Sequence, residues 1–184
     1  MRNPDDDEAW QDFVRVYSPL IYNYCRSRHV QAQDAADITQ EVLLRVNRAI
    51  ASFEYSSKRG LFRDWLARIV RNELSRYVGK KRTGTTVQHS QHEFLEEPGA
   101  SGEDGSLWQE HFQQHILNVA LERTKPQFET VTWRLFTQAW VEQKNAADVA
   151  EEQSVGVDQV YVAKSRVLKR LRQEVSRLAE ENIG

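Results

Sequence analysis

Helical spacing of the apolar residues is the feature that most constrains the fold of this chain. Side chains three and four positions apart share one face of an α-helix, whereas those of a strand alternate between two faces. The apolar residues follow the helical pattern, and no sustained alternation with polar residues occurs. No Asn-Gly or Asp-Gly turn joins two strand-like runs. The sequence therefore predicts an all-α protein.

The helical pattern occurs in segments separated by residues that start or stop helices. The segments are residues 6–28, 34–50, 61–82, 107–123, 127–142, 146–153 and 158–180. Pro19 is expected to kink or interrupt the first segment, because proline has no backbone N–H to donate. Asp34, Asn145 and Asp158 are the expected N-caps, and Pro126 marks the start of a helix.

Composition changes between residues 84 and 106. This stretch holds four of the eight glycines together with Pro98, and it shows little periodicity. Such a composition is typical of an extended linker. We therefore expect two small helical domains, over residues 1–83 and 107–184, joined by a flexible acidic linker over residues 84–106.

The overall composition is that of a soluble protein with a real core. The chain has 184 residues, of which 40% are hydrophobic and 28% charged, and it contains a single cysteine. One cysteine cannot form an internal disulfide, which fits a reducing compartment. The N-terminal residues are acidic rather than apolar, and no run approaches the roughly 18 apolar residues of a membrane span. These features predict a cytoplasmic protein.

A net charge of −2 conceals a strong segregation of charge along the chain. Residues 58–82 contain nine Lys or Arg and two acids, and residues 158–178 contain six Lys or Arg and two acids. Residues 84–110 between them contain six acids and no Lys or Arg. Two basic blocks flanking an acidic connector indicate specific partners, because solubility alone requires no such segregation.

The C-terminal basic block has the layout of a helix-turn-helix. At about 100° per residue, one face of the 158–178 helix is apolar, with Val160, Val167, Leu168, Leu171, Val175 and Leu178. The opposite face carries Arg166, Lys169, Arg170, Arg172 and Arg177. A short helix and a turn containing Gly156 precede it, as in motifs whose second helix enters the major groove. A solvated amphipathic helix is the alternative interpretation.

The first basic block combines a cationic helix with a polar loop. In residues 61–77, Phe62, Trp65 and Tyr77 belong to an apolar face, whereas Arg63 and Arg71 lie among the polar positions. The preceding loop contains Tyr55, Ser56, Lys58 and Arg59. Such a surface suits a nucleic-acid strand, with cations on phosphates and an unpaired base held by the loop. The alternative is that Trp65 and Tyr77 belong to the core, which we favour for Trp65.

The 34–50 helix contains one apolar side chain among polar ones. Asp37, Gln40 and Glu41 share a face with Leu44, opposite the apolar stripe. A single exposed leucine is ordinary in proteins. A leucine ringed by polar groups also fits a small protein-binding patch, and the sequence leaves both interpretations open.

These three segments, in this order, resemble the extracytoplasmic-function (ECF) sigma factors of bacterial RNA polymerase. DAADITQEVLLRVNRAIASF looks like the family segment that docks on the clamp helices of the polymerase β′ subunit. FRDWLARIVRNELSRYVGKKR looks like the helix that captures the −10 element with its preceding loop. The region 4 helix-turn-helix, which reads the −35 element, is similar to NAADVAEEQSVGVDQVYVAKSRVLKRLRQE. The recognition helix of this chain contains VYVAKSRVL, where many family members have a shorter run.

The resemblance implies three sets of binding residues. For core polymerase, they are Asp37, Gln40, Glu41 and Leu44. For the −10 element, they are Ser56, Lys58, Arg59, Arg63, Arg68, Arg71, Asn72 and Arg76. For the −35 element, they are Gln159, Lys164, Ser165, Arg166, Lys169 and Arg170. The resemblance also implies contact with the polymerase β flap and, as the usual family partner, an anti-sigma factor, although no residue of this sequence encodes one.

No motif of an enzyme appears in the sequence. His111 and His115 are four residues apart, as metal ligands can be, but HFQQH lacks the glutamate of the HExxH motif. We interpret both as polar residues beside the linker, and Cys25 as a core residue. The sequence therefore predicts a protein that is not an enzyme and has no cofactor or metal. A stand-alone helix-turn-helix regulator and a protein-binding helical adaptor are the competing hypotheses.

Overall fold

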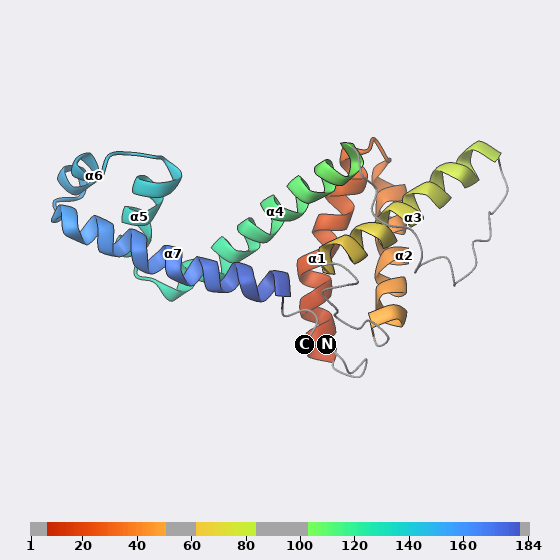
Figure 1. Cartoon of the computed structure of the whole chain (residues 1–184), viewed down its shortest axis with the longest axis horizontal. Helices are drawn as coiled ribbons and strands as arrows, with labels where there is room; N and C mark the ends of the chain where they lie inside the picture. The colour runs from red at the N-terminus through yellow and green to blue at the C-terminus, as the bar shows by residue number, and fades with distance from the viewer. Residues whose placement is uncertain (1–6, 51–61, 84–102, 181–184) are drawn as a thin grey trace. The chain divides into compact units, whose positions relative to one another are not determined.

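The chain is all-helical over the residues that the computed structural model describes, which are 7–50, 62–83 and 103–180, and no strand occurs among them. The predicted all-α class is confirmed. The helices are α1 (Asp7–Ser27), α2 (Ala32–Ile50), α3 (Phe62–Thr83), α4 (Glu103–Thr124), α5 (Thr130–Phe136), α6 (Ala146–Gln153) and α7 (Val157–Glu180) (Figure 1). A 3-10 turn, η2 (Lys125–Gln127), precedes α5, and a π-helical turn, η3 (Thr137–Val141), follows it. The segment expected as one helix over 127–142 therefore contains the last residue of η2, then two non-helical residues, then α5 and η3.

The chain divides into two compact units, and the division falls inside α4. The first unit comprises Met1–His115 with Glu180–Gly184, and the second comprises Ile116–Ala179. The expected second domain began at residue 107, nine residues before the second unit. The difference arises because the first half of α4 packs with α1 and α3. Residues 84–102 of the expected linker lie outside the described residues, and residues 103–106 form the start of α4.

The first unit has an aromatic core built mainly on α1. Phe13, Tyr17 and Tyr24 are fully buried along one side of this helix. The Tyr17 ring lies 5.4 Å from that of Phe62 on α3 and 6.3 Å from that of Phe112 on α4. Burial of such rings is the largest apolar contribution that a small domain can obtain from single side chains. The aromatic spacing of α1 therefore holds α3 and the first half of α4 in one core.

Helix α1 continues through Pro19, which was expected to kink or interrupt it. The proline is exposed, whereas Leu20 and Ile21 beside it are buried. A proline removes one helical hydrogen bond, and burial of the neighbouring apolar residues offsets that loss. The helix ends at Ser27, and His29, two residues later, is left-handed with φ of 61°, as is common just after a helix C-terminus.

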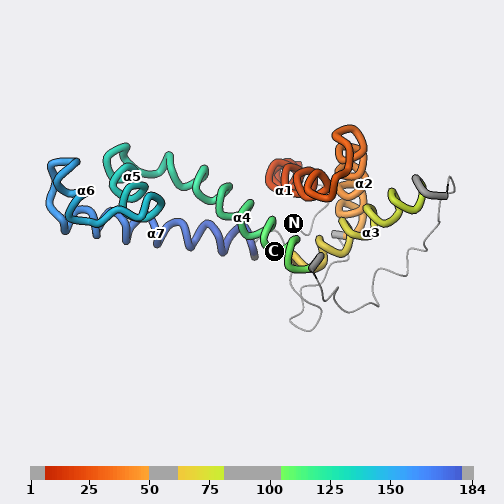
Figure 2. The backbone as a smooth tube through the Cα atoms, turned by 90° about the horizontal axis from the view of Figure 1, so that it is seen from above, coloured from red at the N-terminus to blue at the C-terminus, as the bar shows by residue number. Residues whose placement is uncertain are grey.

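The second unit has a smaller core around the contact between α6 and α7. Leu135, Val149, Ala150, Val160 and Ala163 form its buried cluster. Figures 1 and 2 show α7 beside the second half of α4, with α6 at its N-terminal end. The short side chains of Ala150 on α6 and Ala163 on α7 belong to this cluster, where the two helices pack against each other. The expected N-cap of α6 is confirmed, because the Asn145 side chain accepts a hydrogen bond of 3.0 Å from the Ala147 N–H.

Candidate polymerase and nucleic-acid interfaces

Helix α2 presents the four predicted polymerase-binding residues together on its outer face. Asp37, Gln40, Glu41 and Leu44 are all exposed, and Leu44 leaves 49% of its surface in contact with solvent. The buried stripe on the other side consists of Ala35, Ile38, Thr39, Val42 and Val46. Leu44 is therefore not a core residue, and the packing of α2 leaves this surface open to a partner.

Asp34 joins α2 to α3 rather than capping α2. The helix begins at Ala32, so the predicted N-cap position was wrong, and Asp34 lies in the first turn. Its carboxylate accepts a hydrogen bond from the Tyr77 hydroxyl. Tyr77 is accordingly half-buried, with its polar end used in a contact between helices.

Helix α3 presents its predicted DNA-binding side chains less openly. Arg63, Arg68, Arg71, Asn72 and Arg76 are all half-buried. Arg63 lies 3.3 Å from the Asp64 carboxylate, and its backbone carbonyl accepts a 3.1 Å bond from the Trp108 indole. Trp65, which we favoured as a core residue, is half-buried beside Phe62. The loop candidates Ser56, Lys58 and Arg59 lie outside the described residues.

A buried glutamate neutralises part of the positive charge of α3. Glu73 is 7% exposed and forms ion pairs with Arg45 of α2 and Arg76 of its own helix. Burial raises the pKa of Glu73, while the nearby Arg45 opposes this shift. Arg76 thus has an internal partner, and part of its positive charge is neutralised by Glu73.

A three-residue turn joins α6 to α7, and the order of short helix, turn and longer helix is the one predicted for a helix-turn-helix. Ser154 adopts a left-handed conformation with φ of 53° and ends α6. The Gly156 N–H then donates to the Gln159 side chain at 3.4 Å. Asp158, an expected N-cap, lies in the first turn of α7, which begins at Val157. Buried Val160 and Ala163 lock α7 against Val149 and Ala150 of α6.

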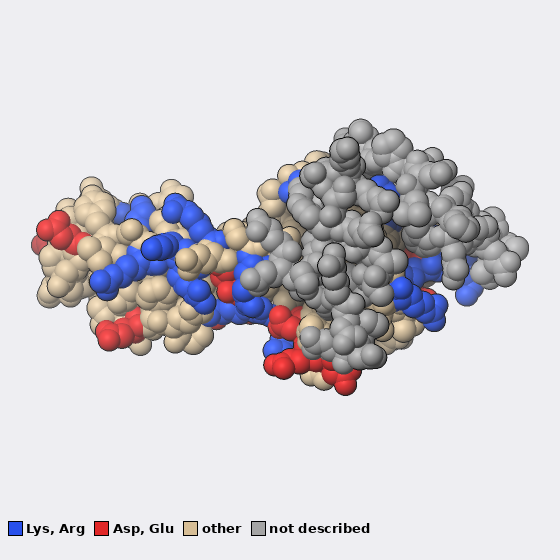
Figure 3. Space-filling model, turned by 60° about the horizontal axis from the view of Figure 1, so that its bottom comes forward, with Lys and Arg blue, Asp and Glu red and all other residues tan. Residues whose placement is uncertain are grey.

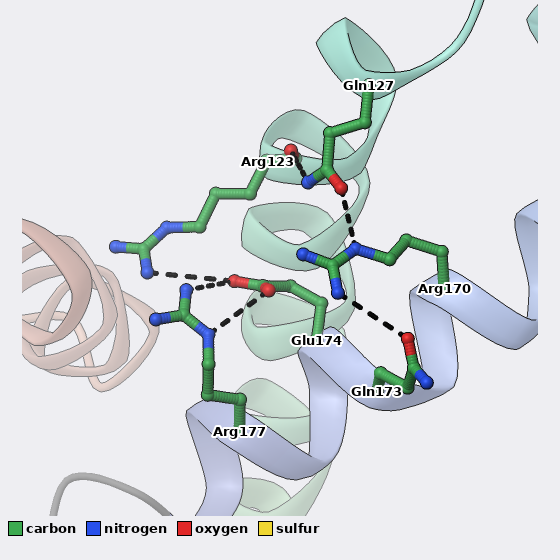
Figure 4. A network of polar contacts seen from close by, with 6 residues as sticks. All are labelled: Arg123, Gln127, Arg170, Gln173, Glu174 and Arg177. Carbon is green, nitrogen blue, oxygen red and sulfur yellow. Dashed lines mark hydrogen bonds and ion pairs between the residues drawn. The ribbon is translucent and has the colours of Figure 1, made fainter.

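Helix α7 presents most of the predicted −35 residues to solvent. Gln159, Ser165, Arg166, Lys169 and Arg170 are exposed, and Lys164 is half-buried. Figure 3 shows Lys and Arg side chains gathered over the surface of the second unit. Arg170 is held by an internal contact, since its Nε donates to the Gln127 Oε1 at 2.6 Å (Figure 4). The remaining exposed cations are well placed to contact phosphates.

A second buried glutamate ties α7 to α4. Glu174 is 3% exposed, and its carboxylate forms ion pairs with Arg177 of α7 and, at 3.7 Å, with Arg123 of α4 (Figure 4). The sequence interpretation did not identify this residue, or the equivalent Glu73. Both lie on the apolar stripe of their helix with an arginine three residues later, and that pattern is the signal that could have found them.

The histidines and the cysteine are structural residues. His115 forms a 2.6 Å hydrogen bond with the Val16 carbonyl, and the His111 ring lies 5.7 Å from that of Tyr24. Both were expected to be polar residues beside the linker, but they pack α4 on α1. Cys25 is fully buried as expected, and burial raises its pKa to about 12. A thiol with this pKa is essentially never the reactive thiolate near neutral pH.

Two further features are absent from residues 7–50, 62–83 and 103–180. No group of three or more His, Cys, Asp or Glu residues is arranged to hold a metal ion there. None of the helices in the described part of the chain is both long and apolar enough to cross a membrane.

One of the comparisons with known proteins falls within the first unit. A family model for sigma-70 region 2 matches residues 13–83. The chain is also similar to the ECF RNA polymerase sigma factor SigW of Bacillus subtilis (strain 168), at 34% identity over 77 residues. This alignment covers 42% of the present chain and 40% of SigW. The resemblance to ECF sigma factors is thereby confirmed.

Two of the three candidate surfaces lie within the residues that match the region 2 model. The match runs from within α1 to the end of α3, and so includes the exposed face of α2 and the half-buried arginines of α3. Helices α4 to α7 lie beyond the region 2 match. For α7, a DNA-binding role is indicated by the preceding short helix and turn and by the exposed cations.

Proposed function

We propose that the protein is an alternative sigma factor, which binds RNA polymerase core and directs it to specific promoters. The observation that carries this proposal is a region 2 domain whose α2 exposes Asp37, Gln40, Glu41 and Leu44 on one face. An apolar group with a polar rim is the usual anatomy of a protein-binding surface. This face would dock on the β′ clamp helices, and the second unit would contact the β flap.

Promoter recognition would be divided between the two units. The exposed Arg166 and Lys169 of α7 would contact phosphates of the −35 duplex, with Gln159 and Ser165 directed at base edges. The arginines of α3 and the preceding loop would hold the non-template strand of the melted −10 element. Exposing a base costs a few kcal/mol, and contacts in the loop would offset that cost. Polymerase core would supply all the chemistry, in the cytoplasm.

Reconstitution tests this proposal directly. The full-length protein is added to sigma-free core polymerase with a pool of genomic promoter fragments, and initiation sites are mapped from the transcripts. We expect transcripts from a defined set of start sites that depend on both components. Tight, sequence-specific DNA binding without core and no dependent transcripts would instead support a stand-alone regulator. Binding to neither DNA nor core would support an adaptor.

The docking face is tested with a double variant, Gln40→Ala with Leu44→Ala. Truncation of two central interface residues costs about 2 kcal/mol each, so affinity for core should fall roughly a thousandfold. Both side chains are exposed, and the fold should remain intact in far-UV circular dichroism. Asn23→Ala on α1 is the matched exposed control. Core affinity that survives in the double variant would refute this docking face.

A further inference from the structure

The first two turns of α7 expose three large apolar side chains, which are Val157 at the start of the helix and, beyond it, Tyr161 and Val162. The proposed function gives no role to the last two. Tyr161 leaves 58% of its surface exposed and Val162 leaves 47%. They follow directly on Val160, which is fully buried against α6. The core of the second unit is therefore complete without them, and their presence at the surface needs another reason.

The helical geometry directs both side chains outward. At about 100° per residue, Tyr161 and Val162 point about 100° and 200° away from buried Val160. Asp158 and Ser165 project from the helix at angles between those of Tyr161 and Val162, and both are exposed. This side of α7 therefore faces the solvent. Tyrosine and valine are weaker helix formers than lysine or glutamine. Neither core packing nor helix propensity explains them.

The surroundings of the pair favour nucleic acid over an apolar protein surface. Arg166 and Lys169 are exposed one to two turns later on the same helix, so the partner that meets Tyr161 and Val162 also meets positive charge. In a helix-turn-helix, this N-terminal part of the second helix faces base edges in the major groove. Asp158 is compatible with that position, because a carboxylate accepts a hydrogen bond from the amino group of cytosine.

We propose that Tyr161 and Val162 form an apolar reading surface for the 5-methyl groups of thymines in the −35 duplex. The thymine methyl is the apolar group that base pairs display in the major groove. This inference rests on the proposed function and adds the residues that would discriminate thymine. Candidates chosen for charge or hydrogen bonding, such as Gln159 and Lys169, supply no such apolar contact.

The test removes the methyl group alone. Duplexes bound by the full-length protein with core polymerase are selected from a random pool, and each thymine in the −35 segment is replaced in turn by deoxyuridine. Burial of one methyl-sized group is worth about 0.8 kcal/mol, so each contacted thymine should show about fourfold weaker binding on replacement. In Tyr161→Ala and Val162→Ala, the loss at one or two of these positions should disappear.

Val131→Ala on α5 is the matched control, because Val131 is exposed to nearly the same degree, at 45%. It should retain the full difference between thymine and deoxyuridine. Equal binding of the two bases by the unaltered protein would overturn the inference, as would variants that keep its full preference. A selection that yields no preferred sequence would instead overturn the proposed function, so the two failures are distinguishable.

Discussion

The two units share one feature, a buried glutamate paired with two arginines. In the first unit the Glu73 cluster consists of Glu73, Arg45 and Arg76. In the second, the Glu174 cluster consists of Glu174, Arg123 and Arg177 (Figure 4). In each, one arginine follows three residues later on the same helix, and the other comes from a neighbouring helix.

The clusters differ in how they relate to the predicted binding surfaces. Arg76 of the Glu73 cluster belongs to the predicted −10 set, and 23% of its side chain is exposed. Arg177 of the Glu174 cluster lies outside the −35 set and keeps 45% of its side chain exposed. A count of cations on a helix therefore overestimates its DNA-binding capacity where some of them neutralise a buried carboxylate.

The largest effect is expected from Glu73→Ala. Removing the carboxylate takes away the buried negative charge with which Arg45 and Arg76 form ion pairs, which costs about 3 kcal/mol of unfolding free energy. Hydrogen exchange measured by mass spectrometry should show faster exchange throughout α2 and α3. Glu110→Ala, at an exposed position of α4, is the control and should change exchange little. Unchanged protection in the Glu73 variant would show that the cluster contributes nothing to the first unit.

Glu174→Ala should cost less, about 2 kcal/mol, because Arg177 can return to solvent more easily than Arg76. Faster hydrogen exchange should be confined to α7 and the second half of α4. A loss equal to or larger than that of Glu73→Ala would contradict the ranking by exposure.

A comparison of Arg71→Ala with Arg76→Ala separates DNA binding from folding. Arg71 has no ion-pair partner among the residues described, so its loss should weaken binding of a −10 single strand by polymerase and this protein. One charge-assisted hydrogen bond is worth about 1.5 kcal/mol, or roughly tenfold in affinity. Arg76→Ala should mainly lower the stability of the first unit. The interpretation fails if fluorescence anisotropy shows equal losses of strand binding.

The smallest effect is a pH dependence that belongs to Glu73. Because its pKa in the folded protein is raised above the ordinary value of 4.5, the folded state binds the proton more tightly than the unfolded state. The unfolding free energy should therefore fall as the pH rises from about 4.5 through the raised pKa. Glu73→Gln should remove this fall, as measured by denaturant titrations at several pH values, whereas Glu110→Gln should preserve it.

Much of the fold followed from local sequence rules. The helical spacing of apolar residues located the helices α2, α3, α6 and α7 to within two residues of their observed starts. Asn145 was identified correctly as an N-cap because its side chain acts on a backbone N–H two residues away. The exposure of Leu44 followed in the same way, from its position opposite the apolar stripe of α2.

Other features depended on neighbours that are distant in the sequence. Asp34 was expected to cap its own helix, but Tyr77, 43 residues later, uses its carboxylate. His111 and His115 were expected to be polar residues beside the linker. Their packing on α1 depends on contacts with Tyr24 and Val16, which are distant from them in the sequence. The break in the 127–142 segment was likewise not predicted.

By itself, the sequence determined which residues form helices, which face of each helix is apolar and where positive charge is concentrated, because periodicity and charge are local properties of the chain. Only the tertiary structure decided which charges are available to a partner. Arg45, Arg76 and Arg123 are paired with buried carboxylates, whereas Arg166 and Lys169 remain exposed. The physical reason is that a charge loses its solvation on burial and must then find an opposite charge, and that partner can lie on another helix far away in the sequence.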